Sequence, residues 1–179
     1  GALYVETRDY ESAIQSLQRA LALYPDFAKA FVNLGNAYKG NKQYAEAAGA
    51  YRQAKQLQPG LHAVSYNLGV LHMDNLLPNV DRLARWDKAK EHLQAYLSNG
   101  KLEDEEKKRV EGLIKEAERG KTREARRIES EKKRAARKAK REAEKKKKAE
   151  EAAKKAGEEA KAAPGGAPKA EDKPADKAA

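Results

Sequence analysis

Hydrophobic residues recur every three or four positions along the first part of the chain, which is the spacing of one face of an α-helix. Phe31, Leu34 and Tyr38 mark one such helix, and Tyr51 with Ala54 marks the next. Short polar stretches that contain glycine or proline separate these helices. The pattern predicts an all-α chain built from paired helices.

The pairs repeat, and residues 28–61 form one complete unit. Gly35 and Gly69 stand at equivalent positions, where a side chain would keep the two helices of a pair apart. Pro25 and Pro59 end the second helix of one pair before the next pair begins. The facing helices carry a small residue at the matching positions: Ala13, Ala47 and Ala89.

These features resemble the tetratricopeptide repeat, which places aromatic, Leu–Gly, alanine and proline positions at this period. The resemblance covers residues 1–101, with a partial repeat at 1–27, a complete repeat at 28–61 and a longer one at 62–100. It implies a right-handed solenoid of helical hairpins. Because the first repeat starts at its glycine, Gly1, we expect the chain to be a fragment, so that a targeting segment could lie upstream.

The third repeat contains an insertion at residues 75–85. Asn79 follows Pro78 and is a favoured N-cap residue, so we expect the second helix of this repeat to begin near Asn79 and to run to about Leu97. Apolar residues at helical spacing form what we call the insertion ridge: Leu76, Leu77, Val80, Leu83 and Trp86. These side chains either fold onto the preceding helix or dock another subunit.

Three segments are expected after the repeats. Residues 102–120 predict a capping helix, with acidic residues in its first turn, that packs on the third repeat through one apolar stripe. The stripe consists of Val110, Leu113, Ile114 and Ala117. Residues 121–163 predict a solvated, basic charged helix rich in Ala, Glu, Lys and Arg, without the apolar seam of a coiled coil. The composition of residues 164–179 predicts a disordered tail.

Composition and charge divide the chain in the same way. All eleven Phe, Tyr and Trp residues precede Leu97, whereas residues 107–148 hold 20 Lys and Arg against 8 Asp and Glu. The basic stretch is open to three roles: a solubilising spacer, attraction to an acidic partner or anionic lipid surface, and contact with the backbone of a nucleic acid. Sequence-specific nucleic-acid recognition is not expected, since no aromatic residue there can stack on a base. No transmembrane segment is predicted, because no run of 18 apolar residues occurs.

Residues suited to catalysis are sparse. The chain has no cysteine, and its three histidines, His62, His72 and His92, lack the spacing of a metal site. His72 occupies the aromatic position of its repeat and is expected in the core. No glycine-rich phosphate loop or nucleophile elbow occurs. The sequence therefore predicts neither an enzyme nor a metal or cofactor site.

The tetratricopeptide resemblance implies a protein–protein interaction scaffold that holds a peptide or partner protein in a concave groove. The positions that correspond to the groove are Lys29, Val32, Asn33, Asn36, Lys39, Tyr66, Asn67, Val70 and Met73. Lys29 and Lys39 favour an acidic partner, and Tyr66 and Met73 offer apolar contact. Lys29 with the three asparagines also resembles part of a clamp for a C-terminal carboxylate, although asparagine is common at these positions of the repeat.

Residues 68–97 and the charged segment that follows also resemble envelope tetratricopeptide repeat proteins of myxobacterial gliding-motility systems. That resemblance implies an exported scaffold in the periplasm or at the outer membrane, and without it we expect a cytoplasmic protein. The alternative function is a tail-driven binder of polyanions, such as nucleic acid or an anionic membrane surface.

Overall fold

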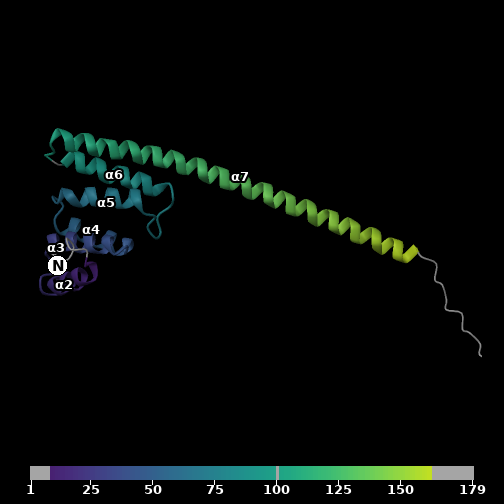
Figure 1. Cartoon of the computed structure of the whole chain (residues 1–179), viewed down its shortest axis with the longest axis horizontal. Coiled ribbons are helices and arrows are strands. Elements are labelled where there is room, and N and C mark those ends of the chain that lie inside the picture. Colours follow the sequence, from purple (N-terminus) through teal and green to yellow (C-terminus); the bar gives the residue numbers. More distant parts are fainter. Residues whose placement is uncertain (1–8, 100, 163–179) are drawn as a thin grey trace, which may run out of the picture. The chain divides into compact units, whose positions relative to one another are not determined.

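The computed structural model describes residues 9–99 and 101–162, which are helical throughout apart from short connections. The helices are α2 (Tyr10–Leu23), α3 (Ala28–Gly40), α4 (Tyr44–Leu57), α5 (His62–Asp74), α6 (Ala84–Asn99) and α7 (Asp104–Ala162) (Figure 1). No strand occurs within these residues, so the all-α prediction is confirmed. The chain divides between Glu129 and Ser130 into two compact units.

The first unit is a stack of helical hairpins, which we call the helical array. Helix α3 pairs with α4 and α5 pairs with α6, while α2 packs on α3 and α4 packs on α5. Figure 1 shows these helices following one another in sequence order. The predicted solenoid of hairpins is therefore confirmed.

Two glycines allow the paired helices to approach closely, as predicted. A Cβ atom on Gly35 would lie 2.5 Å from the ring of Tyr51, and one on Gly69 would lie 2.7 Å from Cγ of Leu93. Both distances are shorter than van der Waals contact, so the partner side chains fill the space that a side chain at either glycine would need. Ala47, on the facing helix, is fully buried.

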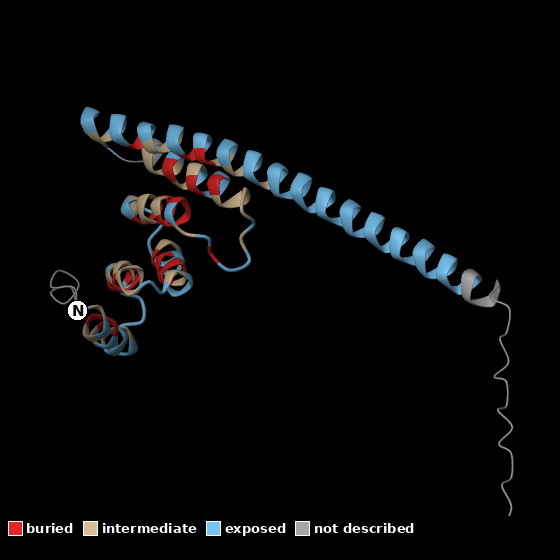
Figure 2. Cartoon of the chain, turned by 45° about the vertical axis from the view of Figure 1, so that its right-hand side comes forward, coloured by how far each residue is buried: buried red, intermediate tan, exposed pale blue. Residues whose placement is uncertain are grey.

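The predicted apolar stripe packs against the third repeat. Val110 and Ala117 are almost completely buried in one cluster with Met73, Trp86 and Leu93. Leu113 and Ile114 lie partly buried against the same cluster. Figure 2 shows this buried surface where α7 faces α6. The start of α7 thus closes the end of the helical array.

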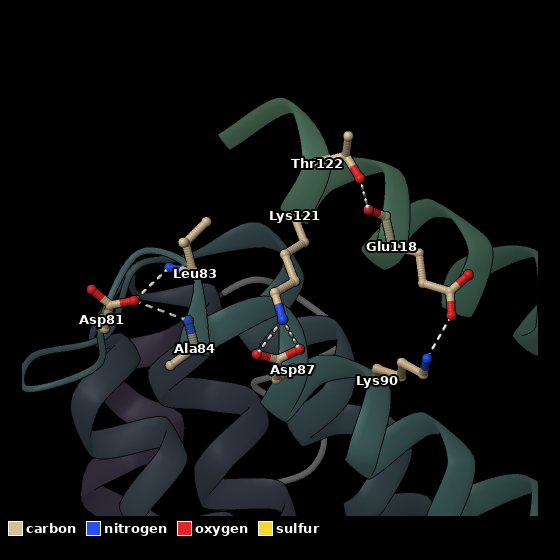
Figure 3. Close-up of polar contacts among 8 residues, drawn as sticks. All are labelled: Asp81, Leu83, Ala84, Asp87, Lys90, Glu118, Lys121 and Thr122. Carbon is tan, nitrogen blue, oxygen red and sulfur yellow. Dashed lines mark hydrogen bonds and ion pairs between the residues drawn. The ribbon is translucent and has the colours of Figure 1, made fainter. Parts of the chain in front are cut away.

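Ion pairs accompany this packing (Figure 3). The Nζ atom of Lys121 lies 2.6 Å from Oδ1 of Asp87, and the Nζ atom of Lys90 lies 2.5 Å from Oε1 of Glu118. The bond from Lys90 holds the pKa of the Glu118 carboxyl below its usual value. Exposed pairs of this kind contribute only about 0.2–1 kcal/mol each, so the apolar contacts contribute most to the attachment of α7.

The capping helix and the charged helix expected from the sequence are consecutive parts of one uninterrupted helix, α7. Its Lys, Arg, Glu and Ala residues all favour helix, and Gly120, where we expected the first of them to end, lies in its interior. From Ser130 to Glu158 every side chain is exposed (Figure 2), as predicted for a solvated helix. The expected disordered tail, 164–179, lies outside the described residues. Among the described helices, none is long and apolar enough to cross a membrane.

The predicted start of the second helix in the third repeat is wrong, because α6 begins at Ala84 and not near Asn79. Asn79 has a φ of 60°, in the left-handed region, which interrupts a right-handed helix. Asp81 provides the cap instead, since its Oδ1 accepts hydrogen bonds from the backbone N–H groups of Leu83 and Ala84 at 2.8 and 3.1 Å (Figure 3). These bonds lower the pKa of the Asp81 carboxyl.

We expect Gly120→Ala to lower the free energy of unfolding by about 1–3 kcal/mol, because the added Cβ would lie 2.5 Å from the ring of the buried Trp86. Gly112→Ala is the matched control on the same helix. Its Cβ would meet nothing within 4 Å, so the gain in helix propensity should raise the free energy of unfolding by about 1 kcal/mol. Urea unfolding followed by the fluorescence of Trp86, the single tryptophan, measures both effects. Equal stabilisation by the two substitutions would contradict the packing of α7 on Trp86.

Candidate functional site

The predicted groove residues lie on α3 and α5, the first helices of two successive hairpins. The side chain of Asn36 joins these helices, because its Oδ1 accepts a hydrogen bond from Nδ2 of Asn67 at 3.4 Å. The same oxygen accepts a 2.7 Å bond from the hydroxyl of Tyr51 on α4. Because this oxygen already accepts two hydrogen bonds within the fold, Asn36 can contact a carboxylate ligand by donating a hydrogen bond from its amide nitrogen.

Exposure differs among the groove residues. Lys29 is exposed, and seven others are half-buried: Val32, Asn33, Asn36, Lys39, Tyr66, Asn67 and Val70. Met73 is buried, in contrast to its predicted role as an apolar contact for a ligand. It belongs to the cluster that α7 covers, so the surface open to a partner excludes it.

Tyr66 is bordered by residues that follow it in the chain. Its ring lies 5.4 Å from the ring of Tyr96, and the guanidinium of Arg109 lies 5.8 Å from its centroid. The hydroxyl of Tyr96 lies 2.7 Å from Oε1 of Glu106, and burial together with this bond raises the pKa of Tyr96 to about 12. Helices α6 and α7 therefore border the α5 side of the predicted groove.

The residues of the insertion ridge do not share one surface. Leu77 is buried in the cluster of α4 and α5, and Val80 packs against that cluster. Trp86 is buried in the cluster beneath α7, with the guanidinium of Arg85 4.2 Å from its ring centroid. Leu83 is half-buried, and Leu76 alone among the five is exposed, at 54%.

A cavity of about 660 Å³, which we call the histidine cavity, lies between α4, α5, α6 and the connection that holds the insertion. His72 and His92 line it, with ring centroids 5.6 Å apart and planes inclined by 16°. His72 is buried, so its predicted place in the core is confirmed. The described residues contain no group of three or more His, Cys, Asp and Glu side chains placed to hold a metal ion.

Both histidines are held in the neutral form. Burial lowers the pKa of His72 to about 4, assisted by the neighbouring His92, Lys88 and Arg52. Burial also lowers the pKa of His92 to about 4, assisted by Lys55 and Lys88. At neutral pH the two rings therefore carry no charge, while the cations around them do.

Sequence reasoning did not find the histidine cavity. Its residues come from three helices and from the insertion, and their spacings follow no known motif. One signal was present: His72 replaces a larger aromatic residue at its repeat position, which leaves room beside it. Only the folded insertion shows that Leu77 and Val80 wall this space.

Comparison with known proteins identifies related repeats. Residues 1–62 match the family model described as tetratricopeptide repeat. Over 103 residues, or 58% of this chain, the sequence is 29% identical to the peroxisomal targeting signal receptor of Candida albicans. It is 30% identical over the same length to the receptor of that name from Eremothecium gossypii. The aligned segments cover 16% and 17% of the two receptors, so the chain spans about a sixth of these curated relatives.

The fold is also similar to that of the type III secretion translocator chaperone SycD of Yersinia enterocolitica. The TM-score is 0.57 at 15% identity, and the likeness covers 66% of this chain and 79% of that one. At this identity the likeness concerns the fold alone. The family match covers residues 1–62, and the repeated hairpins of the helical array have a tetratricopeptide-like arrangement.

Proposed function

We propose that the helical array is a non-enzymatic protein–protein interaction scaffold that holds a peptide or partner protein in the groove formed by α3 and α5. The observation that carries the proposal is the hydrogen bond between Asn36 and Asn67, which links side chains of the two first helices. The match to tetratricopeptide repeats and the similarity to peroxisomal targeting signal receptors support a role in binding a protein or peptide.

The groove residues favour an extended, acidic ligand. Lys29 is exposed and Lys39 is half-buried, so both ammonium groups can approach a carboxylate. The amide groups of Asn33 and Asn67 can both donate to and accept from the backbone of a peptide. Val32 adds a half-buried apolar surface beside them.

We expect Lys29→Glu to weaken the binding of an acidic peptide by about tenfold, because it replaces an attractive charge with a repulsive one. The peptide would be selected from an array of acidic sequences and its affinity measured by fluorescence anisotropy. Arg19→Glu on α2 is the matched control, since it makes the same charge change at an exposed position outside the groove. If both substitutions weaken peptide binding equally, the effect comes from the net charge of the chain, and recognition by the groove is excluded.

A second candidate function is the binding of polyanions through the exposed part of α7. Residues 130–158 hold 13 Lys and Arg against 6 Asp and Glu, and every one of their side chains is exposed. A chain that ends after Glu129 separates the two candidates. Binding that disappears with this truncation, and that falls steeply with salt in the intact chain, would favour the polyanion binder; binding that survives the truncation favours the groove.

We further propose that the scaffold works within a bacterial cell-envelope assembly for gliding motility. This proposal rests on the resemblance of residues 68–97 and of the basic segment that follows them. Fractionation of cells that produce the full-length parent protein tests it. Recovery in the cytoplasm alone would exclude the envelope assembly and would leave the scaffold proposal intact.

A further inference from the structure

The histidine cavity is distinct from the groove, because none of the proposed groove residues lines it. Helix α4 contributes Arg52 and Lys55, and α6 contributes Lys88, Glu91 and His92. Its floor is formed by apolar and aromatic side chains of α5 and of the insertion, among them His72. The insertion therefore does more than fill space, since it completes one wall of a cavity with charged sides.

An unpaired polar atom lies at this floor. His72 is only 5% exposed, and its Nδ1 has no hydrogen-bond partner among the described residues. A buried polar atom without a partner is unfavourable, and most such atoms in proteins are paired. His72 lines the cavity, so a ligand that enters lies beside the ring that carries this atom.

The charged side chains around the cavity favour a ligand of negative charge. Three cationic side chains, Arg52, Lys55 and Lys88, oppose the single carboxylate of Glu91. Arg52 and Lys88 lie near enough to lower the pKa of His72, and Lys55 and Lys88 do the same to His92. An anionic group is therefore attracted to the space beside the two imidazoles.

Size and lining favour an anion that carries an apolar portion. A cavity of about 660 Å³ is far larger than one small inorganic ion, and Ala48, Leu68, Leu77 and Val80 line it together with the polar groups. We propose that the histidine cavity is a second binding site, which takes a carboxylate of a partner peptide together with an adjacent apolar side chain. The carboxylate lies near Arg52 and Lys88, and the apolar side chain lies against Leu77.

Peptide binding at this site is coupled to protonation of the two histidines, so the affinity depends on pH. A carboxylate beside His72 and His92 favours their charged forms, so their pKa values rise from about 4 when the peptide binds. The charged groups that face the pair are Arg52 and Lys55 from α4 and Lys88 and Glu91 from α6. If each histidine pKa rises by about one unit, the affinity at pH 5 is about threefold higher than at pH 7.

The test uses the full chain and three N-acetylated peptides of equal length that contain leucine. The first ends in a free carboxylate, the second is the same peptide with an amidated end, and the third is amidated and carries an internal Glu. Calorimetry at pH 7 and pH 5 gives the affinities, and NMR titration of the imidazole signals gives the histidine pKa values. Binding of the first peptide alone identifies a C-terminal carboxylate as the ligand group, and binding of the third identifies an acidic side chain.

Arg52→Gln and Lys88→Gln each remove one cation at an exposed side chain, and each is expected to weaken binding about tenfold. Arg19→Gln on α2 changes the charge equally at an exposed position outside both the cavity and the groove, so it is the matched control and is expected to leave this binding unchanged. The proposal is overturned if all three peptides bind equally or not at all, or if the histidine pKa values do not move. Sensitivity to Lys29→Gln but not to Lys88→Gln would overturn it too, and would assign the peptide to the groove of the proposed scaffold.

Discussion

Replacing Tyr51 with alanine is expected to lower the free energy of unfolding of the helical array by about 3–5 kcal/mol, as for other large aromatic side chains removed from a core. Tyr51 is completely buried, and its ring fills the space beside Gly35. The loss is a large fraction of the roughly 5–15 kcal/mol that stabilises a typical domain. Guanidinium unfolding followed by circular dichroism measures it.

Two companion variants separate the contributions of Tyr51. Tyr51→Phe keeps the ring and removes only the hydrogen bond to Asn36, so we expect a loss of about 0.5–1.5 kcal/mol. Gly35→Ala is expected to be destabilising in the natural chain but nearly neutral in the Tyr51→Ala background, where the ring that its Cβ would strike is gone. Equal effects of Gly35→Ala in both backgrounds would show that close approach to Tyr51 is not the reason for the glycine.

Ending the chain after Leu102 is expected to destabilise the helical array by on the order of 5 kcal/mol and to promote its self-association. The truncation removes Val110 and its apolar neighbours on α7, each worth about 1.5–3 kcal/mol when fully buried. It also exposes Trp86 and Leu93, which would form an open apolar patch. Thermal unfolding and light scattering measure the two effects.

A chain that ends after Glu129 is the control for this truncation. It keeps the whole apolar stripe and the ion pair between Arg82 and Glu124, and every side chain that it removes between residues 130 and 158 is exposed. We expect its melting temperature to match that of the intact chain. If the two truncated chains melt together, α7 does not stabilise the helical array.

The regular part of the fold could be predicted because each position of the repeat occurs more than once, so one copy supports the interpretation of another. Gly35 and Gly69 occupy the same place in two repeats, and both proved to lie against a large side chain of the facing helix. The insertion occurs once, so it has no second example to guide its interpretation. Asn79 fits an N-cap in sequence, but its positive φ and the cap at Asp81 are properties of the folded connection.

The candidate site shows the same limit. Met73 occupies a groove position of its repeat, yet it is buried, because its repeat is the one that α7 covers. The stacking of His72 on His92 joins two residues whose separation depends on the path of the insertion between them. Sequence patterns predict the surroundings of a residue whose repeat packs between two others. Met73, His72 and His92 belong to the repeat that packs on α7, so the repeat pattern does not predict their surroundings.

The continuity of α7 has a consequence for the exposed basic segment. Starting a helix in water is unfavourable, while extending an existing one is close to neutral for residues such as Ala, Lys and Glu. The turns of α7 that pack on α6 therefore act as a permanent nucleus from which the segment beyond Ser130 propagates. The segment beyond Ser130 is therefore helical because it continues a helix that the helical array stabilises. We expect a protease cut near Glu129 to release a peptide that unwinds far more readily than the same segment in the intact chain.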